Sequence, residues 1–117
     1  MDTAAYQTLF RHLRTRPVPY GIPPGLVPAM VYLIACDEAT DRKLFHGFSE
    51  WIKGQRGDTG FDTAAWFREV ITLAVGQERG EREYYWDLVG EDADRAHRVL
   101  FDSVDGFLSE RQLPSSS

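Results

Sequence analysis

The chain has 117 residues, of which 43% are hydrophobic and 13% aromatic, so it is the size of one ordinary domain with enough apolar material for a core. Residues 1–57 carry seven Lys/Arg and five Asp/Glu, whereas residues 58–117 carry six and thirteen, so the net charge of −5 is concentrated in the second half. This distribution argues against a nucleic-acid binder, which needs a concentrated basic face. No disulfide can form within the chain, because Cys36 is its single cysteine.

From the sequence we expect no segment that directs the protein to or through a membrane. Its first residues do not show the basic-then-apolar order of a signal peptide, and the apolar run 26–36 is interrupted by Pro28 and too short to span a bilayer. Cys36 lies in this run, which predicts a small buried thiol in a reducing compartment. We therefore expect a cytoplasmic protein with no membrane partner.

The first predicted element is a helix over residues 3–15. Its apolar residues Tyr6, Leu9, Phe10 and Leu13 recur at the spacing i, i+3, i+4, i+7, which places them on one helical face. Asp2 or Thr3 is the expected N-cap of this helix.

Residues 16–25 follow and contain four prolines, which predict a stiff, extended connector. Val18, Tyr20 and Ile22 alternate within it. We expect these three side chains to pack on the body of the protein as a buried strap; the alternative is a proline-rich ligand for a partner domain.

Two further helices are predicted in the middle of the chain. The helix over residues 24–37 is apolar nearly all round and is expected to be central, with Pro28 tolerated in its first turn. The next helix is expected to begin at the cap Thr40, to run to residue 56 and to bury Phe48 and Ile52.

The acidic half predicts three more helices. Asp62 is the expected cap of one that ends near Gly76, a short helix over 81–89 stops at Gly90, and a long helix covers 92–111. No convincing alternation of apolar and polar residues extends over the length of a strand. We predict an all-α fold, a single-domain bundle or irregular array of five to six short helices over residues 1–113, with a flexible tail at 114–117. The predicted core consists of Leu9, Leu13, Val31, Leu33, Ile34, Phe48, Trp51, Ile52, Trp66, Val70, Leu100, Val104 and Phe107.

No motif for chemistry emerges from the sequence. His12, His46 and His97 lie on three different predicted helices without metal-ligand spacing, and His46, among aromatic neighbours, is expected to be partly buried. The glycine-rich segment 54–60 lacks the Lys-Ser/Thr of a phosphate loop. We assign no catalytic, cofactor-binding or metal-binding residue and expect no cofactor.

One segment stands out as a candidate contact surface. Tyr84, Tyr85 and Trp86 are consecutive, and on a helix three such residues span about 200° of arc, so we expect Tyr84 or Trp86 to reach the surface. The alternative is a helix wedged between two others that buries all three rings. Aromatic rings amid acidic residues favour a basic protein partner. The predicted partner-binding residues are Glu81, Glu83, Tyr84, Tyr85, Trp86, Asp87, Glu91 and Asp94.

A set of mostly aromatic positions, in two short motifs and three single residues, gives the chain a family resemblance. These positions are Arg16, Pro17 and Tyr20 (Arg-Pro-x-x-Tyr), Gly47, Phe48 and Trp51 (Gly-Phe-x-x-Trp), then Trp66, Phe101 and Phe107. Over residues 9–110 the chain resembles small bacterial all-α proteins of unassigned function that accompany polymorphic toxin systems. It departs from them at Pro19, at Gly21-Ile22 and in the acidic segment 78–94. The resemblance implies a toxin-immunity association and carries over no catalytic residue.

These observations lead to one expected function and two alternatives. We expect a cytoplasmic protein-binding module, an immunity-like inhibitor of a basic toxin, that binds no nucleic acid. The first alternative is a small ligand-binding or enzymatic helical bundle, which needs a deep pocket where His46 or His97 faces two carboxylates. The second is a homo-oligomeric structural protein, in the simplest case a homodimer, that buries the aromatic residues against a copy of itself.

Overall fold

The computed structural model describes residues 2–57 and 65–112. It confirms the predicted all-α class, because the described residues form helices and turns and contain no strand. The elements in chain order are α1 (Thr3–Thr15), the 3₁₀ turn η1 (Val18–Tyr20), α2 (Leu26–Ala39), α3 (Phe48–Gln55), α4 (Trp66–Val75), α5 (Gln77–Arg82), the 3₁₀ turn η2 (Tyr85–Asp87) and α6 (Gly90–Gln112).

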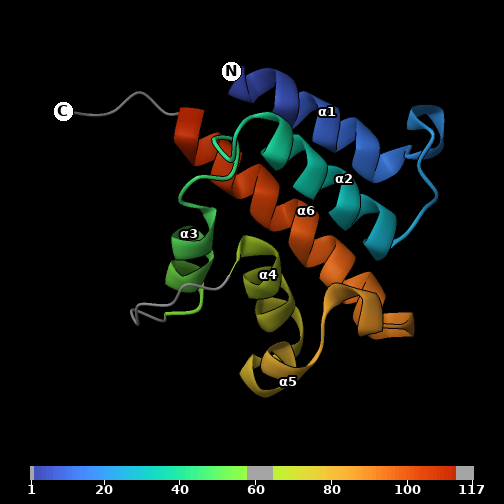
Figure 1. Cartoon of the computed structure of the whole chain (residues 1–117), viewed down its shortest axis with the longest axis vertical. Coiled ribbons are helices and arrows are strands. Elements are labelled where there is room, and N and C mark those ends of the chain that lie inside the picture. Colours follow the sequence, from blue (N-terminus) through green and yellow to red (C-terminus); the bar gives the residue numbers. More distant parts are fainter. Residues whose placement is uncertain (1, 58–64, 113–117) are drawn as a thin grey trace.

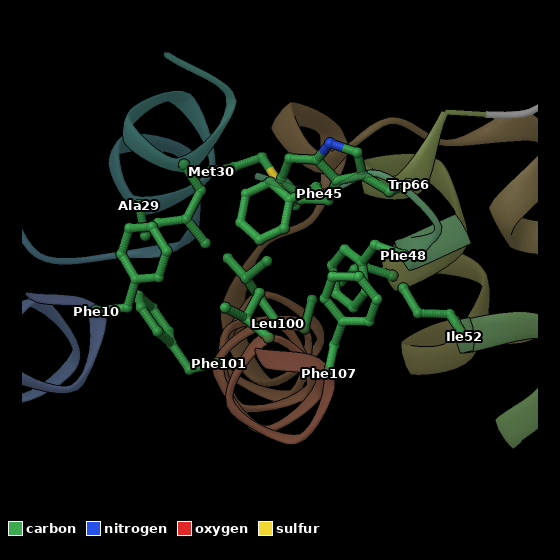
Figure 2. Packing of buried hydrophobic residues seen from close by; sticks show 14 of the residues in the cluster. Phe10, Ala29, Met30, Phe45, Phe48, Ile52, Trp66, Leu100, Phe101 and Phe107 are labelled. Atoms are coloured by element: carbon green, nitrogen blue, oxygen red, sulfur yellow. The ribbon is translucent and has the colours of Figure 1, made fainter. Parts of the chain in front are cut away.

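The long helix α6 is the axis on which the other helices pack. Figure 1 shows α1 and α2 along one side of it and α3, α4 and α5 on the other, with α5 resting on α4. Figure 2 looks down α6: Phe101 points toward Phe10 of α1, while Phe107 points toward Phe48 of α3, with 4.9 Å between the last two ring centroids. The two sides therefore share one continuous apolar cluster.

The first and last helices are joined by polar contacts as well as by their apolar faces. Gln7 is buried, and its amide nitrogen donates to the Asp105 carbonyl oxygen at 3.1 Å and to the Ser109 Oγ at 2.6 Å, while Gln112 donates to its oxygen at 2.7 Å. Arg11 adds an ion pair to Asp105 at 2.6 Å. A buried amide with every group paired fixes how α1 sits on α6.

The predicted helix from Thr40 to residue 56 is wrong in its first half, because α3 begins only at Phe48. Asp41 and Arg42 have φ angles of 57° and 61°, and a right-handed helix cannot pass through two left-handed residues. Thr40 ends α2 instead of starting a helix, and its hydroxyl accepts a hydrogen bond from the Leu44 N–H at 3.1 Å.

A buried carboxylate holds the turn between α2 and α3 in place. Asp37 is 9% exposed, and its two oxygens accept hydrogen bonds from the Phe45 N–H at 3.0 Å and from the Trp66 indole N–H at 3.2 Å. The ring centroids of Phe45 and Trp66 are consequently 4.6 Å apart, and both rings are buried. Asp37 therefore ties α2 to the turn and to the start of α4.

The predicted fifth helix over 81–89 is also wrong. The helix in this region is α5, which ends at Arg82, so the aromatic residues lie in extended chain and in η2. Gly90 begins α6 instead of stopping a helix. Gly80 explains how α5 lies so close to α4: a Cβ at this position would be 2.7 Å from the Thr72 Cα, a distance that no side chain tolerates.

The proline-rich segment 16–25, here called the strap, differs from its prediction. Its turn η1 directs Val18 and Tyr20 outward, so Val18 is 67% exposed and only Ile22 is partly buried. The expectation that all three pack as a buried strap is wrong. The helix α2 is likewise less central than expected, since Val31 is 51% exposed.

Most of the predicted core is confirmed, with identifiable exceptions. Val31 is exposed, Leu9, Ile34 and Trp51 are only partly buried, and Cys36 is partly rather than fully buried. The prediction missed several fully buried side chains, chiefly Phe10, Met30, Leu44, Phe45, Phe101 and Leu108. Gly76 ends α4 as expected, whereas the predicted cap Asp62 and the tail 114–117 lie outside the described residues.

In the ranges 2–57 and 65–112, no helix combines the length and the apolar composition that crossing a membrane requires.

Candidate functional site

Residues 84–86 form an exposed aromatic surface, here called the aromatic turn. Tyr84 is 39% exposed and Trp86 56% exposed, whereas Tyr85 is partly buried, with its ring edge-on to Phe67 at 6.2 Å. The expectation that Tyr84 or Trp86 reaches the surface is confirmed, although the cause is a 3₁₀ turn and not the arc of a helix. The alternative in which all three rings are buried is wrong.

Local contacts hold the aromatic turn in a defined geometry. The rings of Tyr84 and Trp86 are stacked, with centroids 4.6 Å apart and planes at 11°. The Asp87 carboxylate accepts a hydrogen bond from the Tyr84 N–H at 2.8 Å, and the Arg68 guanidinium lies 4.7 Å from the centroid of the Tyr84 ring. Rings fixed in this way lose little conformational entropy when a partner binds.

The acidic residues around the turn are less available than the sequence indicates. Arg79 forms ion pairs with Glu83 at 2.7 Å and with Asp92 at 2.9 Å. These hydrogen bonds from Arg79 lower the pKa of both carboxyl groups, because they favour the charged form. Glu83 is therefore engaged at the end of α5, and the Arg79–Asp92 pair joins α5 to α6, while Glu81 and Glu91 are exposed beside the turn.

Asp94 does not belong with the aromatic turn in the way the sequence suggested. It lines a groove of about 580 Å³ between the end of α1, the strap and the N-terminal half of α6. The groove, as the name is used below, is lined by Arg14, Thr15, Arg16, Pro17, Val18, Pro19, Pro24, Gly25, Leu26, Asp94 and His97. The structure thus separates the predicted contact residues into two surfaces.

His97 lines this groove. Its ring is partly buried against Phe101, with centroids 5.0 Å apart. Burial and, secondarily, the positive charge of Arg14 lower the pKa of His97, while Asp94 opposes this shift. His46 is exposed, so the expectation that it is partly buried is wrong.

The groove only partly resembles the catalytic pocket required by the first alternative function. His97 shares it with one carboxylate, Asp94, where two were required. Among the residues that the structure describes, no three His, Cys, Asp or Glu side chains gather into a group that could hold a metal ion. The groove offers apolar walls, two guanidinium groups and an imidazole.

Sequence reasoning did not find the groove, because its walls come from two segments, residues 14–26 and 94–97, that are distant in the chain. The available signal was the strap itself, in which four prolines fix a backbone that carries apolar side chains. Compared with known proteins, the chain matches no family model, no curated sequence and no solved structure.

Proposed function

We propose that this protein is a protein-binding module that contacts its partner through the aromatic turn. The observation that carries the proposal is Trp86, which is 56% exposed, stacked on Tyr84 and fixed by neighbouring contacts. Tryptophan and tyrosine are enriched among the residues that dominate binding energy at protein interfaces. An exposed tryptophan held in one conformation gains contact area on binding at little entropic cost.

The surroundings of the turn favour a basic partner. Glu81 and Glu91 are exposed on either side of it. Acidic groups at the rim of an interface speed association with a basic protein, by about 10-fold or more at low ionic strength. The specific form of the proposal is an immunity-like inhibitor that masks a basic toxin, as the family resemblance implies.

The test is affinity capture from the source organism with three baits. The wild-type chain is expected to capture a basic protein that Trp86→Ala loses, while Tyr20→Ala retains it. Tyr20 is the matched control, because it is an exposed aromatic residue on the strap and not on the aromatic turn. Binding that is equal for wild type and Trp86→Ala would contradict the proposal.

A second measurement separates a foreign partner from self-association. Light scattering over a range of protein concentrations is expected to give the monomer mass throughout. A dimer that Trp86→Ala dissociates would assign the turn to the homo-oligomeric alternative instead.

A further inference from the structure

The groove between α1, the strap and α6 has the dimensions of a small-molecule site. Its volume of about 580 Å³ lies within the range of ligand pockets, roughly 300 to 1,000 Å³. The smaller hollow between α1 and α6 holds about 180 Å³, and its polar groups Gln7, Arg11 and Asp105 already bind one another. The groove, in contrast, is lined by apolar side chains and by two arginines, Arg14 and Arg16.

The walls of the groove are apolar and open to solvent. Val18 is 67% exposed, Pro19 and Pro24 are exposed, and Leu26 is buried at the start of α2. Val18 is exposed, whereas Ile22, four residues later in the strap, packs against the hydrophobic core. Proline fixes the backbone on this side, so the wall is formed before a ligand arrives.

The charged groups of the groove include two guanidiniums that have free donors. Arg16 forms no ion pair or side-chain hydrogen bond with the residues that the structure describes. Arg14 is held by Asp102 through one nitrogen at 2.7 Å, which leaves its other guanidinium N–H groups available. Asp94 and the partly buried His97 lie on the α6 side of the groove. Guanidinium groups bind carboxylates and phosphates through charge-assisted hydrogen bonds, and a carboxylate on an aliphatic chain also matches the apolar walls.

We propose that the groove binds a small amphipathic anion, an organic carboxylate with an aliphatic chain. Its carboxylate contacts Arg16 and Arg14, and its chain lies against Val18, Leu26 and the prolines of the strap. This site shares no residue with the aromatic turn, so it stands independently of the proposed protein partner.

The test uses octanoate as the ligand and 1-octanol as its uncharged counterpart, each below the concentration at which it aggregates. Two-dimensional ¹H–¹⁵N NMR titrations are expected to show saturable shifts for the backbone amides of Val18, Leu26 and His97 with octanoate. The variant Arg16→Gln is expected to weaken octanoate binding about tenfold, which corresponds to the loss of one charge-assisted contact. Octanol binding should be weaker in the wild type and unchanged by the variant.

Two control variants make the result specific. Arg98→Gln removes an exposed arginine on α6 that does not line the groove and should leave the octanoate affinity unchanged. Trp86→Ala should also leave it unchanged, which keeps this site distinct from the aromatic turn. The proposal is overturned by shifts that do not saturate, by shifts centred outside the groove, or by equal affinities for octanoate in wild type and Arg16→Gln. Equal binding of octanoate and octanol would also overturn it, since this outcome describes a merely apolar surface.

Discussion

Two aromatic clusters in this molecule are built from similar residues, but one is buried and the other is exposed. In the buried cluster, Phe45, Phe48 and Trp66 pack with ring centroids 4.6 to 5.6 Å apart, and the Asp37 carboxylate accepts from the backbone of the first and the indole of the last. In the aromatic turn, Tyr84 and Trp86 stack at a similar distance, and the Asp87 carboxylate accepts from the backbone of Tyr84.

The difference lies in how many elements converge on each cluster. The rings of the buried cluster come from the turn after α2, from α3 and from α4, and Phe107 of α6 packs against them, so every face is covered. The rings of the aromatic turn come from three consecutive residues. Arg68 and Phe67 of α4 contact them, and η2 also lies against α2, yet Tyr84 and Trp86 remain exposed. The rings of the buried cluster are enclosed by the elements that meet there, whereas the neighbours of the aromatic turn cover only part of its rings.

The largest expected effect separates the two clusters by truncation. Phe48→Ala should destabilise the protein by about 3–5 kcal/mol, because it removes a fully buried ring and leaves a cavity. Trp86→Ala should cost about 1 kcal/mol or less, the value of one stacking contact at the surface. Urea unfolding of both variants provides the measurement. Similar losses for the two variants would show that Trp86 contributes as much to stability as the buried Phe48.

The next effect concerns the two aspartates. Asp37→Ala leaves the Phe45 N–H and the Trp66 indole N–H buried without an acceptor, at a cost of about 1–3 kcal/mol for each group. Asp87→Ala leaves the exposed Tyr84 N–H to water and should cost about 1 kcal/mol or less. Unfolding free energies give the comparison, and the indole N–H resonance of Trp66 should shift only in Asp37→Ala. An unchanged resonance would show that Asp37 does not bind this indole.

A third prediction tests what supports the aromatic turn. Gly80→Ala should destabilise the protein by about 1–3 kcal/mol, because its Cβ would force α5 away from the backbone of Thr72. Gly54→Ala is the matched control: it lies in α3 with nothing near its Cβ position and should stabilise by about 0.5–1 kcal/mol. Thermal unfolding of both variants checks the signs. If both variants are stabilised, α4 and α5 are packed less closely than described.

The smallest expected effect is a dependence on acid near the aromatic turn. The lowered pKa values of Glu83 and Asp92 mean that their contribution to stability is complete above their ordinary values of 4.5 and 3.8 and is lost as the pH falls through the lowered ones. The double variant Glu83→Gln/Asp92→Asn should therefore show a flatter fall in unfolding midpoint between pH 5 and about pH 2 than wild type. Identical slopes would exclude Arg79 as the partner that lowers both pKa values.

Helical periodicity predicted the parts of the fold in which apolar residues recur every third or fourth position. The helix over residues 3–15 coincides with α1, and the helix predicted over 92–111 lies within α6. Both have polar residues on the opposite face and few residues that break a helix.

The errors occur where the backbone conformation depends on contacts from elsewhere. Asp41 and Arg42 adopt left-handed conformations, and no glycine in this turn indicates them in the sequence. The segment 77–82 is polar and has no apolar stripe, so periodicity passed over α5, whose position depends on the contact between Gly80 and Thr72.

The candidate sites were predicted to different extents. The expectation that Tyr84 or Trp86 is exposed is confirmed, although the exposure arises from extended chain and the 3₁₀ turn η2 and not from the arc of a helix. The sequence overestimated the free acidic charge, since the pairing of Arg79 with Asp92 joins two elements across a turn. The groove depends on how residues 14–26 are placed relative to Asp94 and His97 of α6, and local sequence patterns do not contain this information.

The docking of α1 on α6 has a consequence for how the protein is made. The side chain of Gln7 bonds to residues about a hundred positions later, and Phe10 and Leu13 complete their burial on the same distant helix. During synthesis, α1 emerges from the ribosome well before α6 exists, so its apolar face stays accessible to chaperones and to other nascent chains until α6 has left the exit tunnel.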